Sequence, residues 1–233
     1  MATILDIAEK LGDAQGYCFQ SIKRAPDISE TLRKTVLETA VEMGYTRQRR
    51  QKNTAKKMCI LVENLDYEEP HQFGYEIVTG FRQMAEPAGF EVEIVPVNEK
   101  LQRSIHYDMF MLQHDYIGAF ALGFTLQDPW MLDFQTSTTP AVLYDNYIKS
   151  NPRIAYVGVD NNEGMELAVS HLKSLGHKKI GYLSGALGSH IMQVRHKGFF
   201  HAMRQNGPQG RIRLRRCFLL CHPVPGEASA SPH

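Results

Sequence analysis

The chain has 233 residues, of which 43% are apolar and 22% are charged, a composition typical of a folded protein with one large or two modest domains. No apolar stretch approaches the roughly 18 residues that a membrane span needs, so we expect no membrane partner. The net charge of +1 hides an uneven distribution: residues 1–57 carry +4, residues 58–206 carry −6 and residues 207–233 carry +3. A basic head before an acidic body indicates an anionic partner for the head alone.

The cysteines favour a reducing compartment. Cys18 and Cys59 lie far from each other and from the pair formed by Cys217 and Cys221, and no secretion signal precedes them. We therefore expect a cytoplasmic protein. The final pair and His222 form a CxxxCH pattern without a second ligand pair, a weak signal, so we expect neither a metal nor a cofactor.

The N-terminal segment is predicted to form three helices. "ATILDIAEKLG" carries apolar residues at helical spacing and ends at Gly12, which can close a helix. "ISETLRKTVLETAVEMGY" begins with Ser29 in position to cap a second helix. The segment between them has the length of a further helix, so residues 1–46 are predicted to be a helix-turn-helix head.

Residues 47–57, "RQRRQKNTAKK", are predicted to be a linker. They contain six basic residues, no acidic residue and no apolar stripe. Such a segment is either a solvated spacer or, beside a DNA-binding head, a contact for phosphates.

Residues 58–206 alternate between predicted strands and helices, which indicates an α/β fold with a doubly wound parallel sheet. The predicted strands are "MCILVENL", "FEVEIVPV", "YIGAFALGF", "PAVLYDN", "IAYVGVDN" and "KKIGYLSG". The predicted helices are "QFGYEIVTGFRQMAEPAG", "EKLQRSIHYDMFMLQH", "DPWMLDFQTS", "NEGMELAVSHLKSLG" and "SHIMQVRHKGFFHAMRQNG". Ligands bind beyond the carboxyl ends of parallel strands, where Asn64, Asp66, Asp145, Asp160 and the "SGALGS" loop are expected. Residues 207–233 follow neither period, and we expect a truncated second lobe with an atypical tail.

Three segments together resemble the lac repressor (LacI/GalR) family of bacterial transcription regulators: "ATILDIAEKLG", "APDISETLRKTVLETAVEMGY" and "VGVDNNEGMELAVSHLKSLGHKKIGYLSG…R…GF". The resemblance is close over residues 2–12 and 25–46 and extends in outline over residues 58–207. It implies a helix-turn-helix head, a hinge, a two-lobed domain like periplasmic sugar-binding proteins, a homodimer and a double-stranded DNA operator.

The stretch "DAQGYCFQSIKR" departs from the family pattern, because "YCF" stands where the family has a Thr-Val-Ser core. Codons for residues 13–24 exist that give "MPRGTVSKALKG" in the neighbouring frame, a good family recognition helix. We therefore hypothesise two compensating frame shifts, which sequencing of the underlying DNA tests.

The resemblance carries DNA contacts onto this chain. We expect them at Thr3, Gln15, Gly16, Tyr17, Gln20, Ser29, Arg47, Arg49 and Arg50. An acidic Asp13 near phosphates and the loss of Ser and Thr hydroxyls predict weak, mostly nonspecific binding. The linker also lacks the leucine wedge of family hinges, so insertion into the minor groove is not expected.

The resemblance also places a carbohydrate-like effector in the cleft between the lobes. The expected contacts are Asp66, Phe73, Asp145, Asp160, Asn161 and Arg195. Carboxylates accept and arginine donates paired hydrogen bonds, which suits sugar hydroxyls. Asp145 and Asp160 could equally be turn or cap residues, Arg195 a surface residue and Phe73 a packing residue.

Other function classes find less support. "SGALGS" lacks the Lys-Ser/Thr of a phosphate-binding loop, and His196 and His201 lack the HExxH spacing, so we expect no enzyme. Two alternatives stay open beside a repressor: a nonfunctional or dominant-negative truncated fragment, and a sugar-binding protein without DNA readout.

Overall fold

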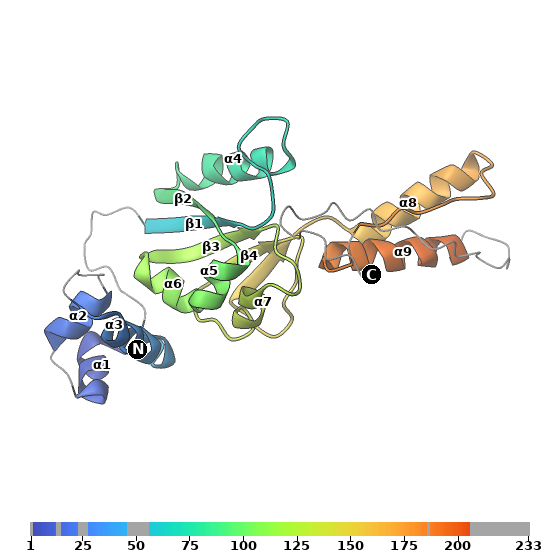
Figure 1. The fold of residues 1–233 in the computed structure, drawn as a ribbon. Helices are drawn as coiled ribbons and strands as arrows, with labels where there is room; N and C mark the ends of the chain where they lie inside the picture. The colour runs from blue at the N-terminus through green and yellow to red at the C-terminus, as the bar shows by residue number, and fades with distance from the viewer. Residues whose placement is uncertain (1, 13–14, 23–27, 46–55, 186, 206–233) are drawn as a thin grey trace, which may run out of the picture. The chain divides into compact units, whose positions relative to one another are not determined.

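The computed structural model describes residues 2–12, 15–22, 28–45, 56–185 and 187–205 (Figure 1). They fall into two compact units, one ending at Gly158 and the other beginning at Val159. The first unit holds a helical head and a sheet-containing first lobe.

The head contains three helices, α1 (Ile4–Leu11), α2 (Gln15–Ile22) and α3 (Glu30–Glu42). Thr3 caps α1 in a reciprocal capping box with Asp6, and Gly12 ends the helix in left-handed backbone with φ of 63°. The helices share a cluster of buried side chains, which includes Ile7, Ala8, Cys18, Ile22, Val36, Leu37 and Ala40. Local caps and one shared core therefore account for the head.

The first lobe is built on five parallel strands. They are β1 (Lys56–Val62), β2 (Phe90–Pro96), β3 (Tyr116–Leu122), β4 (Ala141–Tyr144) and β5 (Ile154–Val157). Their order in the sheet is β2-β1-β3-β4-β5, and every pair is parallel. β1 therefore lies inside the sheet, and its apolar run from Cys59 to Val62 is buried.

Helices cover both faces of this sheet (Figure 1). Helix α4 (Phe73–Ala85) packs on the face that holds Ile60 and Val62. The opposite face, with Cys59 and Leu61, packs against two helices of the other layer, α6 (Tyr107–Gln113) and α7 (Pro129–Asp133). Successive β1 side chains alternate between two hydrophobic cores, so the lobe is doubly wound as predicted.

The helix predicted over residues 99–114 is two helices, α5 (Glu99–Ser104) and α6. Ile105 and His106 between them are extended, with φ/ψ of −149°/137° and −65°/143°. The break has a physical reason: the Ile105 carbonyl accepts a hydrogen bond from Trp130 Nε1 at 2.9 Å, and His106 caps α6 through Nδ1. These tertiary and capping bonds replace the helical hydrogen bonds that periodicity alone predicts.

The second unit consists of α8 (Asn161–Ser174) and α9 (His190–Gln205), which pack around Val169, Phe199 and Ala202. The strand predicted over residues 178–185 does not form. Among the described residues no strand pairs with it, so its backbone has no ladder to join. The prediction of that strand from its apolar pattern was wrong.

Candidate functional site

The carboxyl edge of the sheet in the first lobe presents polar residues in unusual backbone. Asn64, two residues after β1, has φ of 46°, and Asp145, directly after β4, has φ of 55°. Left-handed backbone at residues other than glycine clusters at functional sites, because the surrounding structure must hold it in place. Both residues lie at the edge where the sequence predicted a ligand.

Asp145 is held by β5. Its N–H donates to the Val157 carbonyl at 2.8 Å, which continues the β4–β5 pairing past the strand end. A Cβ atom at Gly158 would lie only 2.4 Å from Asp145 Oδ1, so the carboxylate occupies space that only a glycine leaves open. The acidic side chain is thus packed against the end of the neighbouring strand.

Phe73 and Asp66 lie near this edge as well. Phe73 is the first residue of α4, is 67% exposed, and its ring lies 6.3 Å from the ring of Tyr144, the residue before Asp145. The exposed Asp66 is tied to the start of α4 by its carbonyl, which accepts the Gly74 N–H at 3.0 Å. An exposed aromatic ring beside a carboxylate is an arrangement that can bind one face of a sugar.

Sequence reasoning missed Glu63, a buried carboxyl group directly after β1. It is 4% exposed and accepts hydrogen bonds from Asn64 Nδ2 at 3.2 Å and Gln102 Nε2 at 3.1 Å. Burial, reinforced by Asp128 and Glu99, raises its pKa to about 7. A charged residue ending a buried parallel strand is the signal that could have found it.

Gln102 links Glu63 to the helices on one face. Its amide oxygen accepts the Trp130 backbone N–H at 3.2 Å while its nitrogen donates to the carboxyl group. Both ends of this amide are therefore fixed, and the end of β1 is joined to α5 and α7.

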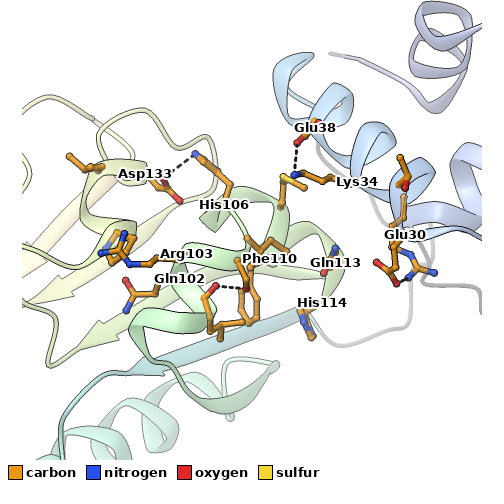
Figure 2. A pocket seen from close by; sticks show the side chains of 18 of the residues that line it. Glu30, Lys34, Glu38, Gln102, Arg103, His106, Phe110, Gln113, His114 and Asp133 are labelled. Atoms are coloured by element: carbon orange, nitrogen blue, oxygen red, sulfur yellow. Dashed lines mark hydrogen bonds and ion pairs between the residues drawn. The ribbon is translucent and has the colours of Figure 1, made fainter. Parts of the chain in front are cut away.

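His106 and Asp133 form a second polar pair in the first lobe. His106 Nδ1 accepts the Asp108 N–H, which places the ring proton on Nε2, and Nε2 lies 3.4 Å from Asp133 Oδ1. Burial raises the pKa of Asp133, although the Tyr107 N–H and His106 oppose the shift. Figure 2 shows His106, Asp133 and Gln102 among the side chains that line a pocket. None of the predicted effector residues is among the described residues that line it.

In the second unit, Asp160, Asn161 and Arg195 lie together. Asp160 caps α8 by accepting the N–H groups of Asn162 and Glu163, each at 3.0 Å. Asn161 Oδ1 accepts a hydrogen bond from Arg195 Nε at 2.6 Å. The capping role expected as an alternative for Asp160 is therefore present.

The predicted effector residues thus form two groups. Asp145 and Phe73 lie at the end of the first lobe's sheet, with Asp66 near the start of α4, while Asp160, Asn161 and Arg195 belong to the second unit. Within each group the contacts above relate the members. A common effector site for the two groups stays a prediction.

In the head, two of the predicted DNA contacts are helix caps. Thr3 Oγ1 accepts the Asp6 N–H at 3.3 Å, and Ser29 Oγ accepts the Leu32 N–H at 3.3 Å. The backbone and side-chain hydrogen bonds from Thr3 lower the pKa of Asp6. Both hydroxyls therefore lie at helix N-termini, where backbone N–H groups favour anions.

The other predicted DNA contacts belong to α2 and to the linker. Gln20 is exposed on α2, and the backbone of Gln15, Gly16 and Tyr17 lies in the same helix. Arg47, Arg49 and Arg50 lie outside the described residues. Their DNA contacts stay predictions.

Helix α2 contains a buried polar side chain that the head core does not accommodate well. Ser21 is fully buried, and its Oγ has no hydrogen-bond partner among the described residues. A buried hydroxyl without a partner is destabilising. In the neighbouring reading frame, "MPRGTVSKALKG" has alanine at position 21 and apolar residues at the buried positions of Cys18 and Ile22, which agrees with the frame-shift hypothesis.

Two further expectations concern metals and membranes. Among the described residues, no group of three or more His, Cys, Asp or Glu side chains is placed to hold a metal ion. Cys217, Cys221 and His222 lie outside those residues.

No helix within the described ranges is both long enough and apolar enough to cross a membrane.

Comparison with known proteins gives relatives of one kind. No family model matches the chain. It is 23% identical over 206 residues to catabolite control protein A of Priestia megaterium, covering 88% of this chain and 62% of that protein. It is also 23% identical over 210 residues to the lactose operon repressor of Escherichia coli (strain K12), covering 88% and 57%. The chain thus spans about three fifths of these relatives.

Solved structures share the fold. The complex of the transcriptional regulator CelR with cellobiose superposes with a TM-score of 0.53 at 21% identity, covering 91% of this chain and 64% of that one. The lac repressor dimer bound to operator and an anti-inducer gives 0.50 at 20% identity, covering 88% and 62%. Together with the repressor relatives, the α/β lobe confirms the resemblance found in the sequence. The chain is similar in sequence and in fold to transcriptional regulators of the lac repressor family.

Proposed function

We propose that this protein is a DNA-binding transcriptional repressor that responds to a small carbohydrate-like effector. The observation that carries the proposal is the order of its parts. Three helices, of which α1 and α3 are capped, precede a basic linker and a parallel, doubly wound lobe with Asp145 and Phe73 at its carboxyl edge. The curated relatives named above are a catabolite control protein and an operon repressor, which favours this function over an enzyme.

The head supplies the proposed DNA-binding site. It comprises residues 1–46 as a helix-turn-helix unit, and the linker of residues 47–57 follows it. The capped starts of α1 and α3 present Thr3 and Ser29 to phosphates, and the linker adds Arg47, Arg49 and Arg50. Base contacts fall to Gln15, Gly16, Tyr17 and Gln20 of α2, a set with few groups suited to direct readout. Salt-sensitive binding with little sequence discrimination follows from this set.

A binding measurement tests the DNA proposal. Fluorescence anisotropy compares duplexes selected from a random library with an unselected duplex at rising salt. We expect at most about tenfold preference for selected DNA, and a salt slope that falls by roughly 0.9 for each linker arginine changed to alanine. Arg82→Ala in α4 is the control, since it removes one charge far along the chain from the head. Absence of salt-dependent binding would contradict the proposal.

The proposed effector-binding domain comprises residues 58–206. Asp145 accepts hydrogen bonds from sugar hydroxyls, Phe73 stacks on a sugar face, and Asp66 borders them. In the second unit, where Arg195 donates a hydrogen bond to Asn161, Asp160, Asn161 and Arg195 are further proposed effector contacts. CelR, which shares the fold, was solved with cellobiose.

A thermal-shift screen tests the effector proposal. Trp130 is the single tryptophan and lies in the core of the first lobe, so its fluorescence reports unfolding of that lobe. We expect cellobiose or another small saccharide to raise the melting temperature, and Asp145→Asn to remove the shift. Asp115→Asn is a matched control, because Asp115 also has left-handed backbone, with φ of 60°, but precedes β3. An equal loss in both variants would contradict a role for Asp145.

The assembly and location follow from the same proposal. We infer a homodimer that acts on a near-palindromic operator in the cytoplasm, beside the chromosome. The lac repressor with a similar fold was solved as a dimer on its operator, which supports this. Sedimentation equilibrium with and without selected DNA measures the stoichiometry, and a single chain per duplex would overturn the dimer.

A further inference from the structure

The second unit contains a side-chain arrangement that orients one arginine. Arg195 lies on α9, on the face that also carries Gly198 and Phe199 towards α8. Its Nε donates to Asn161 Oδ1 at 2.6 Å, a short hydrogen bond from a charged donor. Among the described residues, its terminal nitrogens have no hydrogen-bond partner.

The amide of Asn161 is fixed from the opposite side. Its Nδ2 donates to the Val159 carbonyl at 3.0 Å, so the amide oxygen must face Arg195. Asn161 is also the first residue of α8, and the capping of that helix by Asp160 holds its backbone. Each atom of the amide therefore has one defined partner.

Close packing of the two helices makes this contact possible. A Cβ atom at Gly198 would lie 3.1 Å from Asn162 Oδ1 and 3.4 Å from Met165 Cβ, tighter than ordinary contact. The glycine lets the start of α8 approach α9 one turn after Arg195. The helix crossing, and not the local sequence, brings Asn161 to the guanidinium group.

We propose that Asn161 is a positioning residue that holds Arg195 through its Nε atom. The two terminal nitrogens of Arg195 then donate hydrogen bonds to a pair of adjacent oxygens on the effector. This inference rests on the proposed function of Arg195 as an effector contact, and it changes the role of Asn161 from ligand contact to support. A guanidinium fixed at Nε offers two parallel N–H groups, which match a vicinal diol or a phosphate. Fixing it before binding lowers the entropy lost on binding.

The experiment combines binding and NMR on the full chain. Isothermal titration with cellobiose, which has vicinal diols and no phosphate, and with inorganic phosphate, which has no diol, separates the two sources of the paired oxygens. We expect Asn161→Ala to weaken binding of the preferred probe about tenfold, the size of one hydrogen bond to a charged group. In the Arg195→Ala background the same change should have no further effect. Asn162→Ala is the matched control at the next position, and it should bind as the unchanged protein does.

Solvent exchange of the arginine Nε–H groups, measured by NMR, shows whether Arg195 is held in place when no ligand is present. The Arg195 signal, assigned by its loss in Arg195→Lys, should exchange slowly with solvent, become fast in Asn161→Ala and stay slow in Asn161→Asp, which keeps an acceptor. Melting temperatures of all variants show that the effects are not unfolding.

Different results would overturn the positioning role of Asn161 and the proposed effector contact of Arg195. Unchanged exchange in Asn161→Ala overturns the positioning role. Equal weakening of binding by Asn161→Ala with and without Arg195 shows instead that Asn161 contacts the ligand. Normal binding by Arg195→Ala overturns the proposed function of Arg195, even if the NMR result holds.

Discussion

Two segments with similar sequences behave differently in the two units. "KKMCILV" forms β1 in the first lobe, and "KKIGYLSG", which also begins with two lysines before apolar residues, forms no strand in the second unit. The first segment pairs with β2 and β3 along most of its length, whereas no described strand lies beside the second. A strand is therefore a property of its neighbours more than of its own pattern.

The cores of the two units differ in the same way. The sheet of the first lobe has a hydrophobic cluster on each face, whereas three of the described residues form the buried core between α8 and α9. In the second unit Leu167, Leu175 and Leu183 are 63% to 69% exposed. Helix α8 is capped by Asp160, and α8 and α9 bury no large shared core among the described residues. The first lobe should therefore carry most of the protein's cooperative stability.

The largest expected effect comes from a pair of glycines. Gly123 and Gly176 both have positive φ, 77° and 85°. A Cβ at Gly123 would lie 1.8 Å from the Glu63 carbonyl oxygen, whereas Gly176 faces open space. We expect Gly123→Ala to lower the free energy of unfolding by more than about 4 kcal/mol and Gly176→Ala by about 1 kcal/mol. Urea unfolding followed by far-UV circular dichroism measures both, and equal effects would contradict the difference between the units.

The aromatic core gives the next effect. Phe134 is fully buried and lies 4.7 Å from Tyr107 in a T-shaped contact. We expect Phe134→Ala to cost about 3–5 kcal/mol and Leu167→Ala, on the exposed side of α8, less than about 0.5 kcal/mol. Urea midpoints from Trp130 fluorescence follow the first lobe, and circular dichroism follows both units. A large loss for Leu167→Ala would show that the second unit has a core beyond the described contacts.

Glu63 predicts a pH dependence specific to the first lobe. Its folded pKa, about 7, is above the ordinary value of 4.5, so the folded state holds a proton that the unfolded chain releases. This contribution to stability is complete below about pH 4.5, falls as pH rises to 7, and amounts to up to about 3 kcal/mol. We expect Glu63→Gln to flatten the dependence in Trp130-detected unfolding. The exposed Glu68→Gln should leave it unchanged, and a persistent slope in Glu63→Gln would assign it to another group.

The smallest expected effect lies in the head. Ser21→Ala removes a buried hydroxyl without a partner and should stabilise the head by about 1 kcal/mol. Ser29→Ala removes the cap of α3 and should destabilise it by about the same amount. Hydrogen exchange of head peptides in the full chain measures both the stabilisation by Ser21→Ala and the destabilisation by Ser29→Ala. Faster exchange in Ser21→Ala would show that the hydroxyl contributes to folding and would weaken the frame-shift hypothesis.

Features that depend on neighbours along the chain could be predicted from the amino-acid pattern. Gly12 and Ser29 end or begin helices as predicted, and "MCILVENL" contains the strand β1 as predicted. The alternation of strands and helices predicted the doubly wound lobe, and it placed Asp145 after a strand end. These features are encoded locally, because caps and strand periodicity involve residues a few positions apart.

Features that depend on residues far apart in the chain arise only when the chain folds. Trp130 binds the Ile105 carbonyl at the break between α5 and α6, and the absence of a paired neighbour leaves residues 178–185 without a strand. Burial beside Gln102 gives Glu63 its raised pKa, and the α8–α9 crossing brings Asn161 to Arg195. Such contacts join residues 25 to 39 positions apart in the chain. Local sequence patterns cannot predict them, because these patterns involve residues only a few positions apart.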